Sequence, residues 1–286
     1  MRPLGRLAFV TAIIASSVTV AAQSQRNPTV PELLAAAAKY LDGYEKQFSA
    51  VVSEERYQQS ADPLAARGVR QRILRSDLIV INAGQAGWIS LRDVYEVDGL
   101  PVRDRADRLM KLVTEPAPDS FAQALRVAEE SARFNLGTVW RTINTPTTAL
   151  MFLRRDDQDR STFKFEGLKT VDGVRVAEVA FKETTMPRMI QSVDNAAVEG
   201  KFWIEPASGR VVQTEFRIAS AGNSAKISVR YAHQPKVGLW LPVRMDEEYL
   251  TTVGSNSMFR VRGQITGRAD YQNFRKFDVD VATIIK

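Results

Sequence analysis

The second half of the chain alternates apolar or small residues with polar ones, and this alternation constrains the fold more than any other feature. Along an extended chain every second side chain points to the same side. One such set contains Val212, Thr214, Phe216 and Ile218, and the next contains Ile227, Val229 and Tyr231. A sheet with one covered face and one wet face is typical of antiparallel pairing. The pattern therefore predicts an antiparallel sheet.

Short turn signals between the apolar runs indicate hairpins along much of the chain. Asp-Gly pairs at 98–99 and 172–173 favour tight turns between antiparallel strands, and the stretch from Pro206 to Gly209 marks another turn. These signals divide the chain into extended segments. We expect strands at 49–59, 73–82, 88–97, 162–166, 174–184, 201–205, 211–219, 226–232, 239–250 and 258–268.

Two regions have the pattern of helices that cover this sheet. Thr29 and Glu32 form a capping box, and a second box is expected at Ser120 and Gln123. After the first box, apolar residues recur every three or four positions, namely Leu34, Ala37, Leu41, Tyr44 and Phe48. We therefore predict an α+β fold. It is a strongly curved antiparallel sheet, a half-open β-barrel, covered by an N-terminal helix and by a central helical insert at about 103–155.

The chain begins with the features of a cleavable secretory signal peptide. Arg2 and Arg6 precede and flank the start of an apolar run at 7–20, and small residues up to Ala22 offer a cleavage site. We expect a signal peptide at 1–22, or an uncleaved anchor as the alternative, and one half-barrel domain at 23–286. No later stretch approaches the roughly 20 apolar residues of a membrane span. The cleaved protein is expected to be soluble, periplasmic or secreted, without a transmembrane span.

Composition excludes several classes of site. The chain has no Cys, so it offers neither disulfides nor thiolate metal sites nor cysteine nucleophiles. Its single His, His233, precedes Gln234 and Pro235 and is expected at a turn, where it supports neither a triad nor a zinc site. We assign no catalytic residue, no metal and no cofactor. The net charge of +6 falls to +4 when two Arg leave with the signal peptide, which does not indicate nucleic-acid binding.

Motifs in the C-terminal part resemble those of a known fold family. They are FWIEP at 202–206, SGRVV at 208–212, LWLPV at 239–243 and ADYQNFR at 269–275. Their succession, from Lys201 to Phe277, resembles that of the periplasmic outer-membrane lipoprotein carrier and of the receptor and stress-sensor proteins that share its fold. The resemblance implies a half-open antiparallel barrel with helices in its mouth. The segment from Asp98 to Arg155 has no counterpart in the simple carrier pattern.

Over its full length the chain resembles a set of secreted bacterial proteins. The segments that carry this likeness are LRSD at 74–77, RDVYEVDG at 92–99 and RTIN at 141–144. A shared fold does not imply a shared function, so the residues are weighed for themselves.

The leading hypothesis is a non-enzymatic protein that binds an apolar ligand, an acyl chain or the lipid of a lipoprotein, between sheet and helices. The candidate ligand-binding face consists of Phe216, Ile218, Ile227, Val229, Tyr231 and Met245. The candidate lid or rim consists of Trp88, Met186, Met189, Trp203 and Trp240, although the same residues also suit ordinary packing. A helix or the 186–199 loop would move to admit the ligand.

Two further hypotheses remain open. In the first, the barrel is filled by its own side chains and the protein is an interaction or sensor module that binds an envelope protein. In the second, the protein is a carboxylate hydrolase, which needs two acids converging in a cleft from among Glu54, Asp93, Glu96 and Asp157. Arg residues flank Glu54-Glu55 and the 156–159 acids, which favours solvated ion pairs. Asp93, Glu96 and Asp98 alternate with apolar residues, as on the wet side of a strand and its turn.

Overall fold

The computed structural model describes residues 26–47, 50–62, 68–82, 88–102, 108–109, 111, 119–137, 143–192, 194–220, 222–253 and 261–277. The expected signal peptide at 1–22, Phe48 and parts of the expected insert at 103–155 lie outside these residues. Within them, no helix combines the length and the apolar character that crossing a membrane requires. Among these residues, the helices whose two ends are described are α1 (Val30–Gln47) and α3 (Ser120–Ala132), with the 3-10 helices η2 (Thr148–Leu153) and η3 (Gln158–Arg160), and residues 108, 109 and 111 are helical as well.

One antiparallel sheet organises the described residues. Its strands are β1 (Ala50–Asp62), β2 (Arg70–Asn82), β3 (Trp88–Val97), β4 (Leu100–Pro101), β5 (Ser161–Val171), β6 (Val174–Glu183), β7 (Val198–Ile204), β8 (Val211–Ser220), β9 (Asn223–Gln234), β10 (Leu239–Val253) and β11 (Val261–Phe277). In this part of the chain the eleven strands follow the order β4-β3-β2-β1-β11-β10-β9-β8-β7-β6-β5. The pairing of β1 with β11 joins the first and the last strand. The predicted α+β class with a curved, open antiparallel sheet is confirmed.

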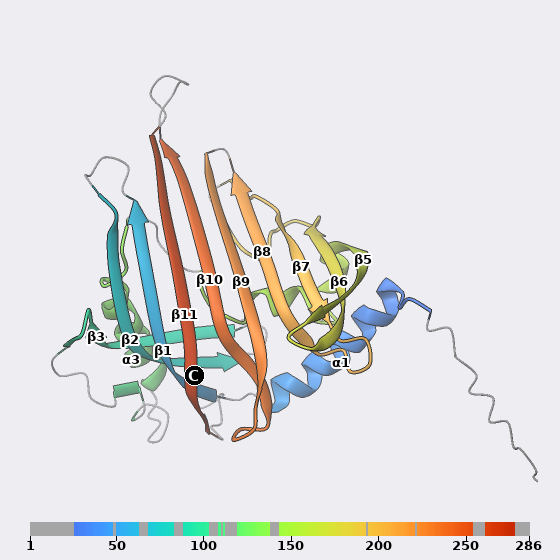
Figure 1. Cartoon of the computed structure of the whole chain (residues 1–286), viewed down its shortest axis with the longest axis horizontal. Helices are drawn as coiled ribbons and strands as arrows, with labels where there is room; N and C mark the ends of the chain where they lie inside the picture. Colours follow the sequence, from blue (N-terminus) through green and yellow to red (C-terminus); the bar gives the residue numbers. More distant parts are fainter. Residues whose placement is uncertain are drawn as a thin grey trace, which may run out of the picture.

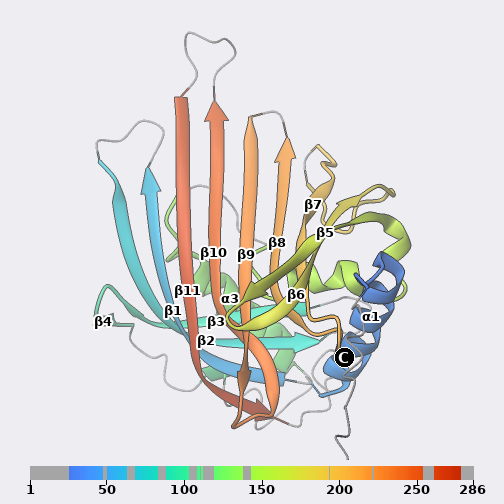
Figure 2. The ribbon, with the colours of Figure 1, turned by 45° about the vertical axis from the view of Figure 1, so that its right-hand side comes forward.

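The sheet bends strongly at its β2–β3 end. Figures 1 and 2 show the last part of β2 and the first part of β3, which pair with each other, crossing behind the long strands β10 and β11. We call the sheet face that is turned towards α1 and η2 the inner face, and the opposite one the outer face. The inner face is the one that a half-barrel encloses.

Local chemistry explains the turns and the first helix. Asp98 and Gly99 have φ values of 50° and 82°, and Asp172 and Gly173 have 47° and 81°, as tight hairpins with two left-handed residues require. At the start of α1, the Thr29 N–H donates to Glu32 Oε2 at 2.9 Å, and the Glu32 N–H donates to Thr29 Oγ1 at 3.4 Å. The first capping box is therefore confirmed.

The second capping box is wrong by one residue. Ser120 is the first residue of α3, and Asp119 holds the cap position. The Asp119 carboxylate accepts a hydrogen bond from Gln123 Nε2 at 2.6 Å, one turn into the helix. The Ser-x-x-Gln spacing alone satisfies the motif, whereas the helix begins one residue earlier than that motif implies, directly after Asp119.

A large apolar core joins α1 and η2 to the inner face of the sheet. It includes Leu41 and Tyr44 of α1, Phe152 and Leu153 of η2, and Phe202 of β7, all at most 3% exposed. The turn between β7 and β8 carries Gly209 with φ of 74°, where a Cβ atom would collide with the backbone of Ala36 in α1. This glycine therefore lets α1 lie directly on the turn.

Helix α3 packs on a second, smaller core. Val127 of α3 lies with Ile79, Ile81 and Leu91 in this cluster, whose β2 residues alternate with those of the main core. The Val94 N–H of β3 donates to Ser131 Oγ at 3.1 Å, so α3 also supplies a hydrogen-bond partner to β3 beyond its ladder with β2. The α3 segment thus supports the bent end of the sheet, while η2 covers the inner face.

Candidate functional site

The candidate ligand-binding face is occupied by the protein's own side chains. Relative exposures are 1% for Phe216, 8% for Ile218, 0% for Ile227, 2% for Val229, 4% for Tyr231 and 0% for Met245. All six belong to the core that contains α1 and η2. The Tyr231 hydroxyl donates to the Pro146 carbonyl at 2.8 Å, which ties the segment before η2 to the sheet. The structure therefore brings the six residues together, beneath the helices.

A cavity of about 310 Å³ lies beside this core. Its walls come from the start of β3, the segment leading into η2, η2 itself and the β6–β7 loop. The lining residues are Trp88, Ile143, Thr145, Thr148, Met151, Met189, Ile190 and Gln191. None of them is charged, and five of the eight are apolar. Such a site suits an apolar body with a small number of polar contacts.

The β6–β7 loop is fixed by one buried acid. Glu183, 1% exposed, accepts from the Met189 N–H at 2.7 Å through one oxygen and from the Val198 N–H at 3.2 Å through the other. Arg188 donates to the carbonyls of Glu183 and Thr185 at 3.4 and 3.3 Å. The Glu183 carboxylate thus links both ends of the loop and sets the position of Met189 in the cavity wall.

Removing the Glu183 carboxylate is expected to loosen the β6–β7 loop. In Glu183→Gln one of the two backbone N–H groups loses its acceptor, because an amide has only one oxygen. We expect the amides of residues 184–197 to exchange with deuterium about fivefold faster, as loss of one hydrogen bond of about 1 kcal/mol implies. Hydrogen exchange with mass spectrometry measures this. Glu199→Gln, at an exposed position of β7, is the matched control, and equal exchange in both variants would contradict the role of Glu183.

The segment leading into η2 brings buried polar groups next to the cavity. Thr145 Oγ1 lies 2.8 Å from Ser90 Oγ, and Thr148 Oγ1 donates to the Ile143 carbonyl at 3.5 Å. Asn144 Nδ2 and Thr147 Oγ1, in residues that are 6% and 0% exposed, make no hydrogen bond within the described structure. Buried polar atoms without a partner are costly, by about 1–3 kcal/mol each. Both atoms belong to residues that are next in sequence to residues of the cavity lining, and both lack a hydrogen-bond partner among the described residues.

Trp88, in the wall of the cavity, packs against Tyr44 of α1. The rings of Trp88 and Tyr44 are 5.9 Å apart at 55°, a favourable tilted contact. Burial raises the pKa of Tyr44 well above its usual range, so the phenol is neutral at any physiological pH. The surroundings of the cavity therefore carry no charge on this side.

The structure distributes the five candidate lid or rim residues over separate places. Trp88 and Met189 meet in the cavity. Met186 lies in the same loop as Met189 but is 53% exposed. Trp203, on β7, donates from Nε1 to Glu178 at 3.1 Å. Trp240, on β10, lies under the Arg210 guanidinium, with 4.1 Å between the guanidinium carbon and the ring centroid.

Charged residues on the sheet are more deeply buried than their spacing indicated. Glu55 is 1% exposed and accepts from Arg92 Nη2 and from Ser76 Oγ, both at 2.7 Å. Asp93 is 4% exposed and accepts from Arg108 Nη2 at 2.8 Å. The expectation of a solvated Glu54-Glu55 pair is therefore wrong for Glu55, and the wet-face interpretation is wrong for Asp93. The reason is that the bent end of the sheet is covered on both sides.

Another buried acid, Glu247, lies on the inner face of the sheet. Glu247 of β10 is 4% exposed and accepts from the hydroxyl groups of Tyr57 and Tyr249, the latter at 3.0 Å. A Cβ atom at Gly267 would be 2.7 Å from Glu247 Cγ and 2.8 Å from Tyr57 Cε2. Gly267 therefore provides the space in which these two side chains meet.

The four acids considered for hydrolysis have separate partners. These contacts are Glu54 with Asn273 Nδ2 at 2.8 Å, Asp93 with Arg108 at 2.8 Å, Glu96 with Arg75 at 3.4 Å and Asp157 with Arg154 at 4.0 Å. Among the described residues no group of three or more acids or His is arranged to hold a metal ion. His233, expected at a turn, is the second-last residue of β9, next to the turn that leads into β10.

Comparison with known proteins gives likenesses among solved structures. No family model matches the chain, and no curated protein matches it. A DUF1329 family protein from Desulfovibrio piger shares 13% identity with a TM-score of 0.39, over 89% of this chain and 95% of that one. A LolA superfamily protein from Nitrosomonas europaea shares 12% identity with a TM-score of 0.35, over 91% and 99%.

A third similar structure is a putative outer membrane lipoprotein-sorting protein domain from Vibrio parahaemolyticus. It shares 9% identity with a TM-score of 0.34, over 86% of this chain and 94% of that one. The likeness to lipoprotein-carrier folds expected from the C-terminal motifs is thus found among solved structures. The properties of the site, however, rest on its own residues.

Proposed function

We propose that this chain is an exported, non-enzymatic binding protein that holds an apolar chain in the cavity between β3, η2 and the β6–β7 loop. The cavity of about 310 Å³, in which no lining residue is charged and five of the eight are apolar, is the observation that carries the proposal. Its volume is about that of ten water molecules, enough for part of an acyl chain. Each methylene buried there contributes about 0.8 kcal/mol to binding.

Polar groups of the segment that leads into η2 would serve as partners for a head group. Asn144 Nδ2 and Thr147 Oγ1 are buried without partners, and their neighbours Thr145 and Thr148 line the cavity. We infer that an ester or carboxyl oxygen of the ligand accepts a hydrogen bond from Asn144. The ligand class is therefore an acyl chain with its head group, either free or as the lipid of a lipoprotein.

Export is part of the same proposal. The signal peptide at 1–22 would deliver the domain at 23–286 to the periplasm or the medium, where it would work as a soluble carrier. The intact mass of the protein purified from the cell envelope tests this. A mass that begins at Gln23 supports export, and one that includes residues 1–22 contradicts it.

Filling the cavity is expected to weaken ligand binding strongly. Met189→Trp replaces a half-buried wall residue with a larger side chain, and overpacking leaves less room for the chain. We expect the affinity for a fluorescent fatty acid to fall about 100-fold, since about 3 kcal/mol of methylene burial is lost. Met186→Trp, in the exposed part of the same loop, is the control and should bind as the parent does.

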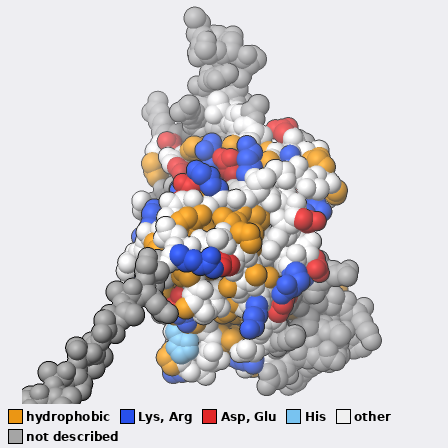
Figure 3. Space-filling view, turned by 90° about the vertical axis from the view of Figure 1, so that its right-hand side faces the viewer, with side chains coloured by type: hydrophobic (Ala, Val, Ile, Leu, Met, Phe, Trp, Pro, Cys, Tyr) orange, Lys and Arg blue, Asp and Glu red, His pale blue; other side chains and the backbone are white. Residues whose placement is uncertain are grey.

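The interaction module is the second candidate function, and two observations favour it. The inner sheet face is filled by α1 and η2, as a closed module requires. Figure 3 shows hydrophobic side chains across the middle of the face at the β5 end of the molecule, with charged groups around them. Three apolar residues of β5, Phe163, Phe165 and Leu168, are only partly buried. Loss of envelope-protein crosslinks in Phe163→Ser/Phe165→Ser, with fatty-acid binding absent in the parent, would favour this function over the carrier.

A further inference from the structure

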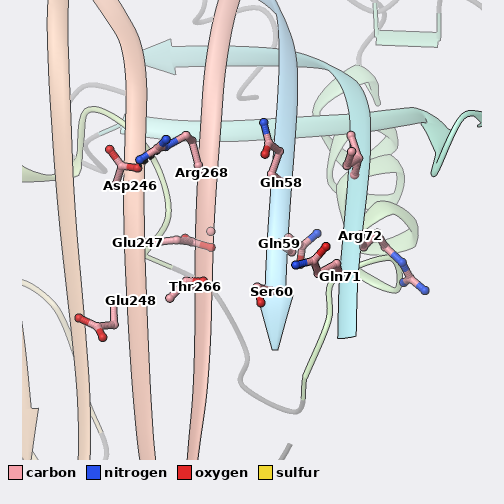
Figure 4. A pocket seen from close by; sticks show the side chains of 12 residues that line it. Gln58, Gln59, Ser60, Gln71, Arg72, Asp246, Glu247, Glu248, Thr266 and Arg268 are labelled. Atoms are coloured by element: carbon pink, nitrogen blue, oxygen red, sulfur yellow. Dashed lines mark hydrogen bonds and ion pairs between the residues drawn. The ribbon is translucent and has the colours of Figure 1, made fainter. Parts of the chain in front are cut away.

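A groove of about 560 Å³, lined mostly by polar and charged residues, crosses four neighbouring strands, β10, β11, β1 and β2. Its residues form three cross-strand rows, which Figure 4 shows at close range. The outer two rows are Asp246, Arg268, Gln58 and Ile73, and Glu248, Thr266, Ser60 and Gln71. Between them lie Glu247, Gly267, Gln59 and Arg72. Strands lie about 4.8 Å apart, so four of them make the groove about 14 Å across.

The groove opens on the outer face of the sheet. Side chains alternate between faces, and the middle row belongs to the inner face, where Glu247 meets Tyr57. The two flanking rows therefore point outwards and form the walls, and the backbone of the middle row forms the floor. This site is separate from the cavity beside η2, with which it shares no lining residue.

The charged groups of the groove already have partners. Arg268 Nε donates to Asp246 at 2.7 Å, and Gln264 Nε2 donates to Glu248 at 2.6 Å. Arg72 donates from Nη1 to the Phe134 carbonyl at 2.8 Å. A charged ligand would have to replace these contacts with its own, because removing an ion from water without giving it a partner is unfavourable. The groove therefore favours an uncharged ligand.

The neutral polar side chains of the groove walls, unlike the charged ones, lack hydrogen-bond partners in the part of the chain that the structure describes. Gln58, Ser60, Gln71 and Thr266 make no side-chain hydrogen bond within the described structure. Two amides and two hydroxyls together offer both donors and acceptors along the walls. Ile73, 38% exposed, adds one apolar contact next to Gln58. Hydroxyl-rich ligands with apolar ring faces match this combination.

We propose that the groove binds an uncharged oligosaccharide, with the amides of Gln58 and Gln71 bonded to sugar hydroxyls and Ile73 against the apolar side of a ring. Three features of the groove support this proposal. Its charged groups are paired, four of its neutral polar side chains have no side-chain hydrogen bond among the described residues, and one aliphatic side chain is exposed. The site is independent of acyl-chain binding. A carrier with both sites would hold a lipid inside and a glycan outside.

Saturation-transfer NMR with chitotetraose, cellotetraose and maltotetraose tests the proposal on the full mature chain. We expect saturable binding of at least one of the three, and binding about tenfold weaker in Gln58→Ala/Gln71→Ala, as loss of two hydrogen bonds implies. Gln272→Ala, an exposed glutamine of β11 outside the groove, is the matched control. Fatty-acid binding and the unfolding midpoint should be the same in all variants.

Three results would overturn the proposal. One is the absence of a saturable signal from all three tetrasaccharides. Another is equal binding by the parent and the double variant, which would place the sugar elsewhere. The third is tighter binding of tetragalacturonate than of the neutral sugars, which would show that the groove selects anions. None of these results bears on the fatty-acid site, so the two proposals fail separately.

Discussion

Replacing Arg92 with methionine is expected to lower the free energy of unfolding by about 3–5 kcal/mol, the usual cost of removing one partner from a buried ion pair. The Glu55 side chain is 0% exposed, and Arg92 donates to it from both Nε and Nη2. Burial by itself would lower the pKa of Arg92, but the adjacent Glu55 carboxylate more than offsets this. The pKa is therefore raised, and the guanidinium remains charged. Without it, Glu55 keeps the neutral hydroxyl of Ser76 as a hydrogen-bond donor.

Chemical denaturation of purified variants measures the loss. Arg75→Met is the matched control, because Arg75 lies 3.4 Å from Glu96 in a pair whose side chains are 53% and 30% exposed. Such surface pairs contribute about 0–1 kcal/mol. Glu55→Leu/Arg92→Met should recover much of the stability, since both charges are removed together. A loss below about 1 kcal/mol in Arg92→Met would show that water reaches Glu55.

Phe216→Ala is expected to cost about 3–5 kcal/mol as well, for a different reason. Phe216 is 1% exposed in the core between β8 and the helices, so its loss removes apolar burial and leaves a void. Phe165→Ala, at a partly exposed position of β5, is the control and should cost less. The same denaturation experiment compares the two variants.

This comparison also separates two views of the inner face. If α1 and η2 fill it, as the structure has them, the Phe216 variant is strongly destabilised. If the face were open and lined a ligand site, truncation would cost about 1 kcal/mol or less, because no packed neighbour would be lost. A small loss of unfolding free energy in Phe216→Ala would therefore indicate that the ligand site is on the sheet face and not in the cavity.

The hairpins and the first helix follow from local sequence. The Asp-Gly turns at 98–99 and 172–173 and the Thr29–Glu32 capping box are complete within a few residues, so no distant contact is needed to identify them. The alternation in β8 and β9 likewise placed Phe216 and Ile227 on the buried face. These features depend on turn chemistry and side-chain periodicity alone.

The burial and the partners of several site residues depend on contacts between distant parts of the chain, so they could not be predicted from the sequence. Glu55 and Asp93 have the spacing of solvated acids, and their burial follows from the bend of β2 and β3 and from α3 against β3. Glu183 showed no signal, because its role is to accept two backbone N–H groups that are 6 and 15 residues away. Trp88 and Met189 were candidates, but their meeting with Met151 of η2 required the three-dimensional fold.

Native mass spectrometry of the protein isolated gently from the cell envelope tests acyl-chain binding most directly. The proposal predicts one lipid-sized adduct per chain, displaced by added fatty acid, retained in Met186→Trp and absent in Met189→Trp. Both variants come from the same loop, so a general effect of added bulk is controlled. A clean mass of the unliganded chain, together with no binding of a fluorescent fatty acid, would contradict the proposal.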